Sequence, residues 1–64
     1  MSEELAYREA DGIAVALLWR RADDVLTVVC ADTRTGEWFS VTPDPARALD
    51  AFYHPYAYAT RLAA

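Results

Sequence analysis

The chain alternates short apolar runs with polar turns. Two strand-length runs, 13–20 (IAVALLWR) and 25–32 (VLTVVCAD), are rich in branched and aromatic residues and are separated by the polar loop RADD. A weaker alternation over 4–10 ends at Asp-Gly (11–12), the pair that best suits a two-residue type I′ hairpin turn. This half of the chain therefore predicts three consecutive antiparallel strands.

The second half predicts a fourth strand and then a helix. Thr35 and Gly36 form a turn signal before the strand-like run 37–42. Asp44 precedes a proline, as an N-cap precedes a first-turn proline, so a helix is expected over 45–53. Pro55 is expected to end it, and the aromatic C-terminal tail over 54–64 is then either a second short helical piece or an extended segment. The predicted fold is α+β: a four-stranded antiparallel meander with one C-terminal helix packed on one face (ββββα).

The turn lengths also predict which side chains share a face. A four-residue loop places three pairs on the core face, and the next turn adds two residues to them: Trp19 with Leu26, Leu17 with Val28, Val15 with Cys30, then Phe39 and Val41. Residues at helical spacing are expected to cover that face, with the last one completing the core: Leu49, Phe52, Tyr53 and Tyr56.

The reverse face of the predicted sheet is also apolar. It gathers Leu5, Tyr7, Ala14, Ala16, Leu18, Val25, Thr27, Val29 and Trp38. The sequence offers no second long helix to cover this face, so we expect it to contact a partner, with Tyr58 contributing from the tail.

Length and composition favour association with another chain. A chain of 64 residues predicts a single small domain, 1–64, and a domain of that size buries only about 60% of its unfolded surface. Cys30 is the single cysteine, so no intramolecular disulfide can stabilise the fold. One cysteine and one histidine are also too few for a structural zinc site with four Cys or His ligands. With 55% hydrophobic residues, the chain has more apolar surface than it can easily bury alone.

Charge narrows the set of partners. The formal net charge is −4 and all the cations are arginine, so a polyanion such as DNA should on average be repelled. There is no apolar run of membrane-spanning length, and the first residues, MSEEL, are acidic where a signal peptide is basic. We therefore expect a cytoplasmic protein that does not contact a membrane.

The candidates for chemistry are few. His54 is the natural starting point for acid–base catalysis, and Asp50, four residues earlier, could orient its ring. Cys30 lies within an apolar strand, where an inert buried thiol is expected rather than an activated nucleophile. No oxyanion or orienting groups complete a site, so we expect no catalytic residues, no cofactor and no enzyme activity, with His54 as a helix C-terminal residue.

Metal and phosphate sites are not expected either. Asp23 and Asp24, with Asp32 on the same hairpin, lack the ligand spacing and turn glycine of a calcium loop. Gly12 and Gly36 are isolated in hairpin turns and cannot form a phosphate-binding loop.

Three long segments carry a family resemblance. The runs DGIAVALLW (11–19), DTRTGEWFSV (32–41) and ALDAFYHPYAYA (48–59) resemble a group of small actinobacterial proteins of similar length. A central Arg-Thr-Gly and a closing His-Pro-Tyr-Ala-Tyr-Ala-like segment recur in that group. The resemblance covers nearly the whole chain and implies the single-domain organisation, but it assigns no catalytic or binding residue.

Two functions from different classes follow from these patterns. The first is a cytoplasmic protein-interaction module without catalytic activity, which forms a homodimer or binds another protein through Leu5, Tyr7, Leu18, Trp38 and Tyr58. The alternative is a regulatory protein that contacts nucleic acid, with Trp19 as a stacking residue and a cluster of arginines: Arg20, Arg21, Arg34 and Arg47. A cluster of four arginines on one surface would favour the alternative. Whether a small apolar ligand binds at the sheet stays open.

Overall fold

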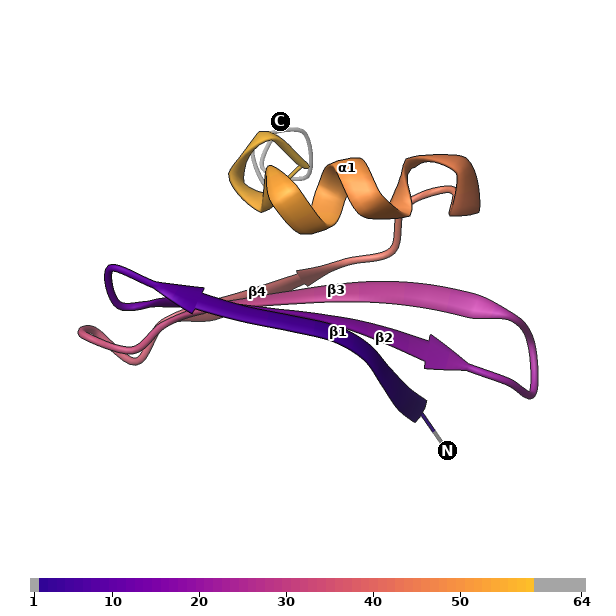
Figure 1. Cartoon of the computed structure of the whole chain (residues 1–64), viewed down its shortest axis with the longest axis horizontal. Coiled ribbons are helices and arrows are strands. Elements are labelled where there is room, and N and C mark those ends of the chain that lie inside the picture. The colour runs from indigo at the N-terminus through magenta and orange to yellow at the C-terminus, as the bar shows by residue number, and fades with distance from the viewer. Residues whose placement is uncertain (1, 59–64) are drawn as a thin grey trace.

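The computed structural model describes residues 2–58, which form one antiparallel sheet with a helical segment on one side (Figure 1). The strands are β1 (Ser2–Ala10), β2 (Ile13–Arg20), β3 (Val25–Asp32) and β4 (Trp38–Val41), and they are hydrogen-bonded in sequence order. The predicted ββββα meander is thus confirmed. β1 begins two residues earlier than predicted, and β4 is shorter at both ends.

The hairpin turns explain why the strands pair in this order. Asp11 and Gly12 have φ values of 54° and 81°, which are the left-handed conformations that a two-residue type I′ turn requires. The second hairpin closes with Arg20 opposite Val25, and Asp24 accepts a 2.7 Å hydrogen bond from the indole Nε1 of Trp19. Both turns are local, and together they fix the register of the first three strands.

The predicted registers are confirmed across the sheet. Val15 lies opposite Cys30, and Leu17 lies opposite Val28; β4 then places Phe39 opposite Cys30 and Val41 opposite Val28. The buried core joins this face of the sheet to the helix and consists of Val15, Leu17, Val28, Cys30, Val41, Ala48, Ala51 and Phe52. Apolar side chains packed on alternate positions of neighbouring strands are what hold the two layers together.

The expected helix over 45–53 is divided in two. Pro45–Arg47 is a single turn of 3-10 helix, and α1 (Ala48–Tyr53) follows it. Asp44 precedes the first turn as predicted, but its side chain makes no capping hydrogen bond; its carbonyl accepts the amide of Arg47 at 2.8 Å instead. α1 ends at Tyr53, and residues 55–58 are helical again after the proline, so the start of the tail takes the helical alternative.

The prediction of which side of the helix faces the sheet was wrong for three of four residues. Phe52 is buried, but Leu49, Tyr53 and Tyr56 are 61%, 59% and 52% exposed. The buried positions are Ala48, Ala51, Phe52 and Pro55, which have the same helical spacing shifted by one residue. Small alanines let the short helix lie close to the sheet, and this close approach leaves the bulky side chains outside.

Candidate functional site

The face of the sheet turned away from α1 is uncovered by any described element (Figure 1). We call it the open face. The strand registers place on it Tyr7 from β1, Ala14, Ala16 and Leu18 from β2, Val25, Thr27, Val29 and Ala31 from β3, and Trp38 from β4. Apart from Arg20 at the end of β2, opposite Val25, the two central strands contribute no charged residue to this face, so the predicted apolar reverse face is present in the structure.

Side-chain size varies systematically across the open face. At the end near the β1–β2 turn its two central strands have short side chains, Ala14, Ala16 and Ala31, while Tyr7 and Trp38 lie on the two outer strands and are 56% and 67% exposed. The outer strands are three strand spacings apart, about 14 Å. Large aromatic side chains therefore flank the end of the open face where the alanines lie.

Leu5 lies at an irregularity of β1. The register of β1 shifts between Glu4 and Ala6, so this strand has one extra residue opposite β2 at a β-bulge. Leu5 occupies the bulge and is 51% exposed. Leu18, which pairs with Glu4, is half-buried nearby on β2. Three of the five residues predicted for the interface, Tyr7, Leu18 and Trp38, thus lie on the open face, and Leu5 is exposed at the bulge of β1.

The fifth predicted interface residue lies elsewhere. Tyr58 packs half-buried against the core on the helix side of the sheet, and its hydroxyl donates a 2.7 Å hydrogen bond to Oδ2 of Asp50. This hydrogen bond raises the pKa of Tyr58. Tyr56, which was expected to complete the core, is the more exposed of the two, with its ring 5.4 Å from that of Phe39. Because the chain is helical after the proline, positions 56 and 58 diverge by about 200°.

The other candidates for chemistry do not assemble into a catalytic site. His54 is exposed at the end of α1, as expected for a helix C-terminal residue, and its backbone amide donates to the carbonyl of Asp50 at 2.8 Å. The carboxylate of Asp50, which was expected to orient the His54 ring, accepts the hydrogen bond of the Tyr58 hydroxyl. Cys30 is buried at 1% exposure in the core, as predicted, and a hydrogen bond with it is the second cause, after desolvation, that raises the pKa of Tyr56. Histidine and thiol are therefore on different elements, with no common partner among the described groups.

The acidic residues of the hairpin loops make ion pairs within their own loops. Arg20 binds Asp23 through two hydrogen bonds of 2.8 and 2.7 Å, and this contact lowers the pKa of the Asp23 carboxyl. Arg34 lies 3.3 Å from Asp32 and lowers its pKa in the same way. Within residues 2–58, no three potential ligands gather closely enough to hold a metal ion.

The arginines of the alternative nucleic-acid hypothesis are not gathered on one surface. Arg20 and Arg21 lie at the β2–β3 loop, where Arg21 contacts Glu3 at 3.3 Å. Arg34 packs against Gly12 at the opposite end of the sheet, about 25 Å away along an eight-residue strand. Because each of these three has an acidic partner, the structure offers no local basic patch there.

One arginine has a role that the sequence pattern did not reveal. Arg8, on the helix-facing side of β1, donates from Nε and Nη2 to the carbonyl of Phe52 at 3.2 and 2.9 Å, and from Nη2 to the carbonyl of Tyr53 at 3.2 Å. Its guanidinium also lies 5.5 Å from the centre of the Phe52 ring. Arg8 therefore caps the C-terminal end of α1 from the sheet, where carbonyl groups lack helical partners. The feature of the sequence that could have indicated this role is an arginine at a strand position that faces the helix side of the sheet.

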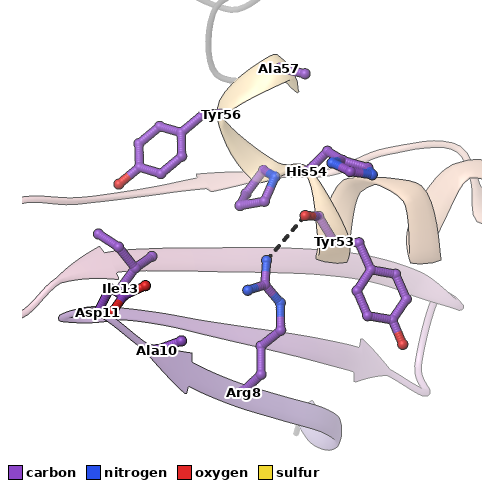
Figure 2. A pocket seen from close by; sticks show the side chains of 9 residues that line it. Arg8, Ala10, Asp11, Ile13, Tyr53, His54, Tyr56 and Ala57 are labelled. Atoms are coloured by element: carbon purple, nitrogen blue, oxygen red, sulfur yellow. Dashed lines mark hydrogen bonds between the residues drawn. The ribbon is translucent and has the colours of Figure 1, made fainter.

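A cavity of about 470 Å³ lies beside this contact, between the Asp11–Gly12 end of the sheet and the segment from Tyr53 to Ala57 (Figure 2). A second cavity of about 370 Å³, lined in part by Cys30, Trp38 and Phe39, lies towards the β3–β4 turn. Tyr56 lines both cavities.

Comparison with family models, curated proteins and solved structures finds no match to this chain. No helix within the described part of the chain is both long enough and apolar enough to cross a membrane.

Proposed function

We propose that this protein is an interaction module without catalytic activity that self-associates through the open face of its sheet. The observation that carries the proposal is the composition of that face. Apart from Arg20 at the end of β2, its two central strands contribute no charged side chain there, and its two largest aromatic side chains, Tyr7 and Trp38, are more than half exposed. Contiguous apolar surface of this kind marks interaction sites on small proteins.

A second copy of the same face fits by size. Two sheets packed face to face lie about 10 Å apart, and the space between them is filled by side chains from both. Alanines at 14, 16 and 31 are too short to fill half of the space between two packed sheets, whereas Tyr7 and Trp38 are long enough to extend past its middle. A two-fold arrangement sets the aromatic side chains of one copy against the alanines of the other, which is how large and small side chains interdigitate.

The size and charge of the face predict a reversible dimer. The 29 strand residues (9, 8, 8 and 4) cover a flat area of about 470 Å², below the roughly 800 Å² per partner of a standard interface. Charged residues, Glu4, Glu9 and Arg20, lie at the margin of the face, where interfaces are polar. Because each copy carries a net charge of −4, added salt should strengthen association, whereas it weakens binding to nucleic acid.

Sedimentation of the pure protein over a range of micromolar concentrations tests the proposal. The wild type should shift from monomer to dimer as concentration rises. Ala16→Glu places a charge at the centre of the open face and should leave only monomer. Leu49→Glu introduces the same charge on the exposed side of α1, where Leu49 is 61% exposed, and should dimerise like the wild type. A wild type that sediments as a 7.1 kDa monomer at high micromolar concentration contradicts the proposal.

A further inference from the structure

The 470 Å³ cavity lies on the helix side of the sheet, so it is independent of the open face and of the proposed dimer. Its volume falls within the roughly 300–1,000 Å³ of small-molecule sites. Figure 2 shows Arg8 rising from β1 at its centre, with Ile13 and Tyr56 on one flank and Tyr53 on the other. The walls are mostly apolar, since alanines and a proline complete them.

Arg8 is the polar group held most firmly in this cavity. Three hydrogen bonds to the carbonyls of Phe52 and Tyr53 use its Nε and Nη2 and fix the plane of the guanidinium. Among the described residues, no carboxylate forms an ion pair with Arg8, and Nη1 makes no hydrogen bond. In Figure 2 one terminal nitrogen of the guanidinium makes the dashed bond to Tyr53, and the other terminal nitrogen points towards the side of the cavity where Ile13 lies. A half-buried arginine therefore keeps two N–H groups and its full charge available in a fixed position.

The remaining polar groups set the kind of ligand. Asp11 lies at the rim of the cavity in the hairpin turn, where it is exposed and its charge is screened by water. His54 is also exposed at the rim. The charge of Arg8 is less well solvated than either, because it lies under the end of α1, so an anionic group is favoured next to it. The ring of Tyr56 offers a flat apolar surface a short way along the same wall.

The geometry points to a binding site for a small aromatic carboxylic acid. The carboxylate accepts hydrogen bonds from Nη1 of Arg8, and the aromatic ring packs between Ile13 and Tyr56. Arginine binds planar carboxylates well, and an arginine already held in place loses little conformational entropy when it does so. The same arginine would thus close the helix with two of its nitrogens and bind the ligand with the third.

Phenylacetate and its neutral analogue phenylacetamide are the probes, and the amide chemical shifts of isotope-labelled protein are the measurement. Phenylacetate should shift signals of residues around the cavity, including Ile13 and Ala57, and should bind about tenfold more tightly than phenylacetamide, as expected for one charge-assisted contact. Equal affinities of the two probes, shifts confined to the open face, or no shifts at millimolar concentrations would each overturn the inference.

Two variants and a control locate the site. Arg8→Gln should abolish the preference for phenylacetate over phenylacetamide. Because that variant also weakens the helix cap, Ala10→Phe provides a second test: it fills the cavity from β1 while leaving Arg8 intact, and it should prevent binding of both probes. Ala46→Phe makes the same change at an exposed position outside the cavity and should bind like the wild type. Unchanged binding by Ala10→Phe contradicts the assignment.

Discussion

Replacing Arg8 by methionine is the sharpest test of how this small fold is held together. Methionine keeps an unbranched apolar stem over Phe52 but removes the guanidinium that closes α1. The variant loses three hydrogen bonds of 2.9 to 3.2 Å and a contact between the guanidinium and the Phe52 ring at 5.5 Å. The carbonyls of Phe52 and Tyr53 are left to water, which reaches that of Phe52 only in part because its hydrogen bonds with Arg8 are partly buried.

The magnitude follows from these contacts. Hydrogen bonds that involve a charged group contribute about 1.5–3 kcal/mol in favourable cases, and a cation at a helix C-terminus about 0.3–2 kcal/mol. These contributions overlap and the site is partly solvated, so we expect the free energy of unfolding to fall by about 1–3 kcal/mol. For 64 residues the entropy of unfolding is about 0.13 kcal/mol/K, so the melting temperature should fall by about 7–20 °C.

Circular dichroism during heating measures this change, with all proteins at one concentration because self-association also affects the melting temperature. Arg21→Met is the matched control. Like Arg8, Arg21 donates to an oxygen, here the carboxylate of Glu3 at 3.3 Å, and its guanidinium lies 5.5 Å from the centre of an aromatic ring, that of Trp19, but its side chain is 69% exposed. Its loss should cost less than about 0.5 kcal/mol. If Arg8→Met melts no lower than Arg21→Met, the role assigned to Arg8 as a helix cap is wrong.

Two further predictions concern the core. Phe52→Ala removes the largest buried side chain contributed by α1 and should lower the free energy of unfolding, measured by urea titration, by about 3–5 kcal/mol. A loss of that size is a large part of the stability of a marginally stable domain. Leu49→Ala, at a position that is 61% exposed, should stay within about 1 kcal/mol of the wild type. Similar losses of stability for the two variants would contradict the finding that α1 buries Phe52 against the sheet and leaves Leu49 exposed. Cys30→Ala should change stability by only about 1–2 kcal/mol, and the native thiol should react slowly with a thiol reagent at neutral pH; rapid modification would show that Cys30 is accessible.

The sequence by itself determined the strands, their order and their pairing. The reason is that these features depend on neighbours in the chain. Asp11 and Gly12 adopt the left-handed conformations of a two-residue turn, and each hairpin then fixes its own register, so Val15 opposite Cys30 could be predicted by counting residues. The open face follows from the same count, because alternation assigns every strand residue to one side of the sheet.

Only the tertiary structure decided how the helix sits on the sheet. Two stripes with the same helical spacing were available, one residue apart, and the sequence favoured the bulkier one. The structure selects Ala48 and Ala51 because close approach of backbone to sheet, with Arg8 holding the end of α1, outweighs the burial of larger side chains. The positions of Tyr56 and Tyr58 depend in turn on the direction of the chain after the proline. Long-range contacts of this kind, between residues 44 positions apart, leave no periodic signal in the sequence.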